Sequence, residues 1–237
     1  MDKFFNSLKR KKTPGVFNPW FERDPANDAL ATAPQLRLDN LKRYLAERQN
    51  AEYLLLAEAV GYQGGHFTGI PMTSERIILG NKSDAGILPV HVCNEALHRT
   101  SNTEIYPGGF NEPTATIVWQ KLNSENLDTR NFVLWNAFPW HPYKSDKGLL
   151  TNRTPSNSEM LEGLSVLNNL LEAFNFKTII ALGNKAHATL KRLNIKTKKV
   201  RHPAMGGADL FRKQFVEILL EQKATNNIRM NRPKTLS

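Results

Sequence analysis

The chain has 237 residues, a formal net charge of +10 and a single cysteine. This length suits one domain with a substantial core, whereas one cysteine excludes an intramolecular disulfide and a metal centre built from several thiolates, and no apolar stretch is long enough to span a bilayer. The basic excess suggests a polyanionic partner, most simply nucleic acid, although such charge can also serve solubility alone.

The first 35 residues are predicted to form a basic N-terminal arm. Residues 1–5 lack the apolar core of a secretory signal, so we expect a cytoplasmic protein. The run Lys9–Lys12 is typical of a solvated, partly mobile surface segment. The alternative is a non-specific contact to phosphate groups or an address signal.

Beyond residue 35, helical periodicity alternates with short apolar runs that are typical of buried parallel strands. The predicted strands are Tyr53–Ala57, Phe132–Trp135, Thr178–Leu182 and Thr197–Arg201. The predicted helices are Leu36–Glu47, Ser158–Phe174, Ala186–Leu193 and Ala208–Leu220, with Ser156 or Ser158 as the N-cap of the second. This alternation predicts an α/β fold with a mostly parallel sheet. Residues 223–237 are predicted to be a polar, basic tail.

Polar side chains follow all four predicted strands. Glu58, Asn136, Asn184 and His202 each come just past a strand end. In open parallel sheets, ligands bind outside the carboxyl ends of the strands. A lone His202–Pro203 is more often a turn than a functional site. It indicates a site only if the fold brings it close to the other three residues.

Three motifs together resemble the uracil-DNA glycosylase superfamily. They are the loop Ala57–Gly61, the strand end Leu134–Ala137 and the pair His202–Pro203, which occur in the order and contexts of that family. The run Gly61–Arg76 is similar to a bacterial branch of it. The resemblance covers about residues 54–215 and implies a three-layer α/β/α sandwich around a four-stranded, mostly parallel sheet. We therefore expect one such domain over residues 36–222.

The resemblance implies catalytic roles for three strand-end residues. Cleavage of the bond between a pyrimidine and its deoxyribose leaves negative charge on the departing base, and His202 would be the preorganised donor that stabilises it. Asn136 would hydrogen-bond to the edge of the flipped base, although a capping role would explain an asparagine here without the family context. Glu58 would position water or stabilise the cationic sugar, or else it accepts hydrogen bonds from loop amides.

The resemblance also implies a base pocket that departs from the best-known uracil enzymes. Ala59 takes the position of a water-activating Asp, and Gly61 takes that of the large Tyr that rejects thymine beside the base C5 atom. Tyr62 either refills that space or points elsewhere. Met72 replaces the stacking aromatic residue, and a Met can pack on a base face. Phe67 is a second stacking candidate, with a core role equally compatible.

Duplex DNA would have to release its target base into such a pocket. Met205 lies in the place of the family's wedge loop and could enter the gap left in the base stack, unless it is a core residue. Arg201, Lys185 and Arg212 are candidate contacts to phosphate.

The favoured function is a monofunctional DNA glycosylase that removes uracil or a C5-modified pyrimidine and leaves an abasic site, without a metal or other cofactor. We expect a monomer that acts on double- or single-stranded DNA. Gly61 makes an alternative role against modified bases of phage DNA possible. The other hypotheses are a catalytically silent DNA-binding protein with the same fold, which Ala59 motivates, and a hydrolase of free nucleosides, which the charge disfavours.

Overall fold

A four-stranded parallel sheet forms the centre of the molecule. The computed structural model describes residues 1–124 and 127–230, with the backbone alone for residues 223 and 225–230. The strand order is β3-β2-β5-β6, built from β2 (Tyr53–Ala59), β3 (Phe132–Phe138), β5 (Thr178–Leu182) and β6 (Lys198–Val200). Leu55 of β2 is in register with Leu134 on one side and Ile180 on the other. The predicted α/β class and the four predicted strands are thus confirmed.

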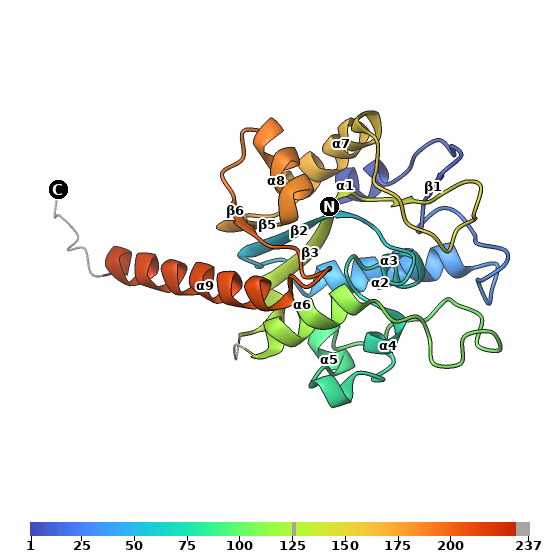
Figure 1. The fold of residues 1–237 in the computed structure, drawn as a ribbon, viewed down its shortest axis with the longest axis horizontal. Coiled ribbons are helices and arrows are strands. Elements are labelled where there is room, and N and C mark those ends of the chain that lie inside the picture. Colours follow the sequence, from blue (N-terminus) through green and yellow to red (C-terminus); the bar gives the residue numbers. More distant parts are fainter. Residues whose placement is uncertain (125–126, 231–237) are drawn as a thin grey trace.

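Helices cover both faces of the sheet and complete the three predicted layers (Figure 1). One face carries α1 (Asp2–Ser7), α7 (Asn157–Ala173) and α8 (Gly183–Arg192). The other carries α2 (Ala33–Ala46), α6 (Pro113–Ser124) and the start of α9 (Ala208–Met230). On the first face Phe4 packs edge-on against Trp135, with 5.1 Å between ring centroids. At the free edge of β3, the Leu134 amide donates to the Tyr44 hydroxyl of α2 at 2.8 Å.

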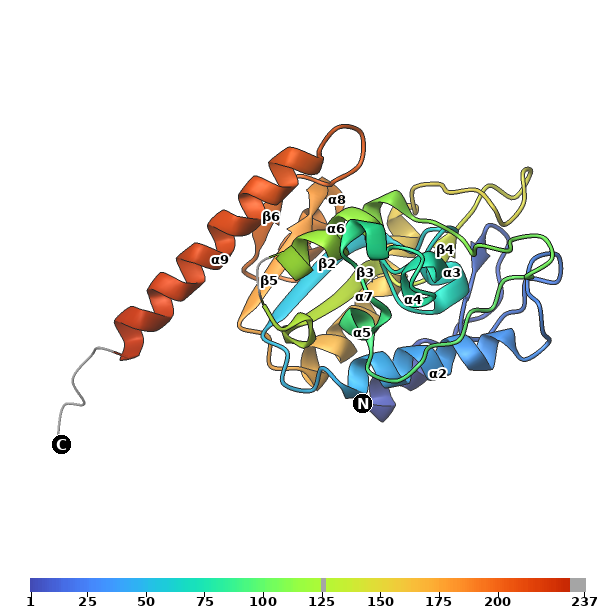
Figure 2. The ribbon, with the colours of Figure 1, turned by 90° about the horizontal axis from the view of Figure 1, so that it is seen from below.

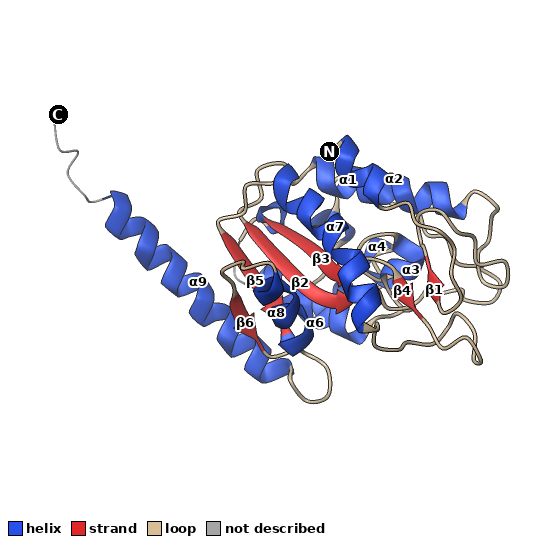
Figure 3. Ribbon diagram, turned by 90° about the horizontal axis from the view of Figure 1, so that it is seen from above, coloured by secondary structure: helices blue, strands red, loops and turns tan. Residues whose placement is uncertain are grey.

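Short elements occupy the long connections and were not predicted. They are β1 (Val16–Phe17), α3 (Gly65–Thr68), α4 (Glu75–Ile78), η1 (Ser83–Ala85), α5 (Pro89–Val92), η2 (Thr129–Asn131) and β4 (His141–Pro142). Strands β1 and β4 form a separate antiparallel pair, visible beside α3 in Figure 3. Elements of two to four residues are too short for hydrophobic periodicity to reveal them.

The helix ends follow local capping chemistry. Helix α7 begins after Ser156, whose hydroxyl accepts from the Glu159 amide at 3.2 Å in a capping box. Of the two predicted candidates, Ser156 is therefore the N-cap. Helix α8 begins at Gly183, three residues before its predicted start. Helix α9 continues to Met230, and its last turns extend beyond the body (Figure 2). Of the predicted tail, residues 231–237 lie outside the described residues.

The first 35 residues pack onto the domain, although the sequence suggests an arm. Phe4 and Leu8 are fully buried in the same core as the sheet. The guanidinium of Arg10 pairs with Glu162 at 2.9 Å and lies 4.9 Å from the ring centroid of Trp140. Apolar residues spaced between the basic ones therefore anchor a segment that its charge makes look solvated.

Candidate active site

A cavity of about 750 Å³ opens at the carboxyl ends of β2 and β6. Its size falls within the range of small-molecule sites, about 300–1,000 Å³. Five of the predicted site residues line it: Glu58, Gly61, Met72, His202 and Met205. The sheet thus brings together residues that lie up to 147 positions apart in the sequence, and we refer to this space as the strand-end cavity.

His202 lies on the loop after β6 with a defined tautomer. Its Nδ1 accepts a hydrogen bond from the Ala204 amide at 3.1 Å. Burial, together with the charge of Arg201, lowers the pKa of His202 below its usual value. The ring is therefore neutral at pH 7 and carries its proton on Nε2, which has no hydrogen-bond partner among the described residues. Such an imidazole can donate to an anion without being charged itself.

Gly183 fixes the place of His202. It is the first residue of α8, with φ at +84°, and a Cβ there would lie 3.2 Å from the Cβ of His202. The positive φ and the close approach both favour glycine. The turn between β5 and α8 thus provides the surface against which the imidazole rests.

Glu58 and Asn136 differ in their access to the cavity. Glu58 is half-buried, lines the cavity, and makes no hydrogen bond or ion pair within the described residues. Asn136, which neighbours the strand position of Ala57, is 1% exposed and does not line the cavity. Its Oδ1 is buried without a hydrogen-bond partner in the described part of the chain. An unpaired buried acceptor of this kind is costly unless a donor arrives.

The space beside Gly61 accepts a small group without a clash. A Cβ at Gly61 would make ordinary van der Waals contact with Glu112 and Asn152, at 3.7–3.9 Å. Tyr62 does not refill this space, because it packs edge-on against Phe110 and lies outside the cavity lining. A side hollow of about 290 Å³, lined among others by Gly61, Glu112, Asn152 and Met205, adjoins the cavity here.

The two stacking candidates have different positions. Met72 lines the strand-end cavity at 4% exposure, with a left-handed φ of +50° that is uncommon for a residue other than glycine. Phe67 is fully buried and stacks on Phe110, with 4.2 Å between ring centroids. Phe67 is therefore placed as a core residue, which was the second of the two roles considered for it.

Of the four predicted DNA contacts, only Met205 lines the strand-end cavity. Met205 is 95% exposed, so it is not a core residue. Arg201 lines a separate hollow of about 430 Å³ with Lys199 and the start of α8. Lys185 is exposed on the first turn of α8, and Arg212 pairs with Asp209 at 2.8 Å.

Six polar residues line the cavity without having been predicted as site residues: Glu112, Thr114, Lys144, Asn152, Arg153 and Thr154. Burial raises the pKa of Glu112 to about 7. Arg153 is paired with Glu159, and its hydrogen bonds lower the pKa of that carboxyl to about 2. Apart from Thr114 of α6, the six residues lie on loops without periodicity or a recognised motif, so no signal in the sequence pointed to them.

A buried relay holds the loop that carries Asn152. His141 donates from Nε2 to the Thr151 carbonyl at 2.8 Å, and burial lowers its pKa to about 3, so the ring is neutral. Its Nδ1 therefore accepts from His66 Nδ1 at 2.9 Å, while His66 Nε2 lies 3.1 Å from Asp24. The two ring nitrogens of His66 can both donate only if the Asp24–His66 pair holds one proton more than a neutral imidazole beside an ionised carboxylate.

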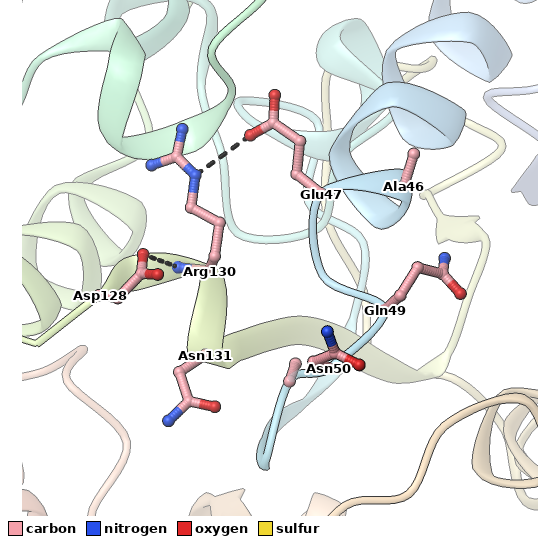
Figure 4. Close-up of a pocket in the computed structure, with 8 residues that line it drawn as sticks. Ala46, Glu47, Gln49, Asn50, Asp128, Arg130 and Asn131 are labelled. Carbon is pink, nitrogen blue, oxygen red and sulfur yellow. Dashed lines mark hydrogen bonds and ion pairs between the residues drawn. The ribbon is translucent and has the colours of Figure 1, made fainter.

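A second polar hollow lies at the opposite end of the strands from the strand-end cavity (Figure 4). It has a volume of about 380 Å³ and lies where β2 and β3 begin. Glu47 and Arg130 form an ion pair across it at 3.1 Å, and the Arg130 amide donates to Asp128. Its charged groups are thus already engaged in structural contacts, which favours the strand-end cavity as the candidate site.

The sequence profile of the Uracil DNA glycosylase superfamily matches residues 49–228, about three quarters of the chain. The chain belongs to the uracil-DNA glycosylase superfamily. Comparison of the sequence with curated proteins gives no match. A crystal structure of wild-type SMUG2 from Pedobacter heparinus is similar in fold, with a TM-score of 0.57 and 17% identity over 95% of this chain and 97% of that chain.

Membership in the uracil-DNA glycosylase superfamily confirms the resemblance predicted from the three motifs. Members of this superfamily are DNA glycosylases, and the match supports a uracil-DNA glycosylase-like activity that acts on DNA. Among the described residues, no helix has both the length and the apolar character needed to cross a membrane.

Proposed function

We propose that this chain is a monofunctional DNA glycosylase that hydrolyses the N-glycosidic bond of a flipped-out uracil or C5-modified pyrimidine in DNA. The observation that carries the proposal is the neutral His202, whose Nε2 proton is free at the same cavity that Glu58 lines. A donor for a departing anion and a carboxylate for water or sugar are the two groups that this hydrolysis needs.

In the proposed mechanism, the bond between C1′ and the base nitrogen breaks with its electron pair moving to the base. His202 donates from Nε2 to the base oxygen on which negative charge accumulates. Glu58 stabilises the positive charge at C1′ and accepts a proton from the water that attacks there. Asn136, with its unpaired Oδ1, hydrogen-bonds to the base edge once the base has entered. The products are the free base and an abasic site.

The open space beside Gly61 supports a substrate with a substituent at C5. Neither Tyr62 nor another aromatic ring fills it, since Tyr62 packs on Phe110. Exclusion of thymine by steric contact is therefore not expected at this position. The same space favours the second candidate role, removal of modified bases from phage DNA in host defence.

The test is a panel assay of base release. Duplex and single-stranded oligonucleotides that contain uracil or a C5-substituted pyrimidine are incubated with the full chain, and the released base is identified by mass spectrometry. We expect intact abasic strands, whereas strand cleavage without added base would indicate a lyase, for which the cavity residue Lys144 is the available amine. Salt-dependent DNA binding with no base released from any substrate would instead support the catalytically silent alternative.

Met205 is proposed to enter the base stack when the target leaves it. Its backbone φ of +52° and that of Gly206 at +73° support a sharply turned loop that holds the side chain outward. We expect Met205→Ala to slow base release from duplex DNA about ten-fold and to affect single-stranded DNA much less, because only the duplex must be unstacked. Leu161→Ala, which truncates an exposed leucine of α7, is the control. Equal losses on both substrates would contradict a wedge.

A further inference from the structure

Glu112 presents a carboxyl group without a partner to the strand-end cavity. The residue precedes α6, where its carbonyl accepts from the Thr116 amide at 3.1 Å. The carboxyl itself is different, because its Oε2 is inaccessible to solvent and has no hydrogen-bond partner in the described residues. A buried carboxylate normally has a cation or several donors around it.

The glycine-rich loop is shaped around this carboxyl. A Cβ at Gly64 would overlap Oε2, so any other residue there would displace the carboxyl from its present position. A Cβ at Gly61 would lie 3.7 Å from Oε1, which places the carboxyl along the wall of the open space beside that residue. Asn152 contributes its amide to the same wall, at 3.9 Å from the same point. Two polar side chains thus border the space that the missing tyrosine leaves.

We propose that Glu112 is a specificity-determining residue, whose carboxyl accepts a hydrogen bond from a hydroxyl group on the C5 substituent of the flipped pyrimidine. This inference rests on the proposed function, which puts the base C5 atom beside Gly61. The favoured substrate class is then a pyrimidine with a polar, hydroxyl-bearing group at C5. An apolar substituent of similar size would leave the buried carboxyl unpaired, and sites built around such a polar group discriminate strongly against analogues that lack the partner.

Binding measured on DNA that resists cleavage tests this inference apart from catalysis. The probes are duplexes with one 2′-fluoroarabino nucleotide whose base is either 5-hydroxymethyluracil or thymine, which differ by a single oxygen atom. We expect the wild type to bind the hydroxymethyl probe about 10- to 100-fold more tightly, the range for a hydrogen bond to a charged group. Glu112→Gln should retain a preference of only a few-fold, because a neutral acceptor is weaker, and Glu112→Ala should have none.

The control is Glu104→Ala, which removes an exposed carboxyl elsewhere; thermal melting confirms that each variant is folded. Equal affinity of the wild type for the two probes, or an unchanged preference in Glu112→Ala, overturns the inference even if the enzyme releases bases. A preference that depends on Glu112 in a protein that releases no base supports the inference and rejects the hydrolase. The two failures are therefore distinguishable.

Discussion

His202→Ala is expected to release base about 100- to 1,000-fold more slowly than the wild type, the usual cost of losing one preorganised donor to a developing anion. The neutral ring donates from Nε2 because Nδ1 is occupied by the Ala204 amide. The measurement is the single-turnover rate of abasic-site formation on whichever DNA substrate the wild type cleaves fastest. DNA affinity should change little, since the donor acts chiefly in the transition state.

Two further variants make the His202 result specific. His98→Ala removes a histidine that contacts Asp39 of α2 and does not line the cavity, and it should leave the rate unchanged. His202→Gln keeps a neutral donor near the same place and should recover part of the lost rate. A rate for His202→Ala within three-fold of the wild type would remove His202 from the mechanism.

Glu112→Gln is expected to be more stable than the wild type at pH 8 and to unfold at a higher denaturant concentration. Its free energy of unfolding should be greater by up to about 3 kcal/mol. Burial raises the pKa of Glu112 from 4.5 to about 7, so the folded protein binds more protons than the unfolded chain between these values. Stability that is present below pH 4.5 is therefore lost as the pH rises through 7. The residue as a whole is half-buried, whereas its Oε2 is inaccessible, which makes this figure an upper limit.

Denaturant unfolding at pH 5 and pH 8 measures the effect. The gap between Glu112→Gln and the wild type should be below about 1 kcal/mol at pH 5 and should open towards pH 8. Glu104→Gln, at an exposed position, should follow the wild type at both pH values. A gap that does not vary with pH would mean that the Glu112 carboxyl is already compensated in the folded protein.

The sheet was predictable because its strands are continuous apolar runs. Tyr53–Ala57 and Thr178–Leu182 pair in parallel and are covered on both faces, so their sequences leave little choice but burial. The N-terminal segment was harder to predict, because Lys9–Lys12 dominates its charge while Phe4 and Leu8 supply its contacts. The charge of successive residues does not reveal which of their neighbours point into the core.

The site was predictable at strand ends and unpredictable on loops. Glu58 is the penultimate residue of β2 and His202 follows β6, and parallel topology brings strand ends together. Glu112 and Asn152 reach the same cavity through connections whose course depends on tertiary contacts, such as the bond from His141 to Thr151. The role of Asn136 stays a prediction, because the residue is buried and is not among those that line the cavity.

The folded domain includes residues that precede the segment matched by the family profile. The profile match begins at residue 49, yet Phe4 packs on Trp135, the residue beside Asn136, and α2 supplies Tyr44 to the free edge of β3. A fragment cut at the start of the recognisable homology would therefore remove contacts from one face and from the free edge of β3, the strand that carries Asn136. The segment that matches the family profile is thus shorter than the packed domain that holds the site residues in position.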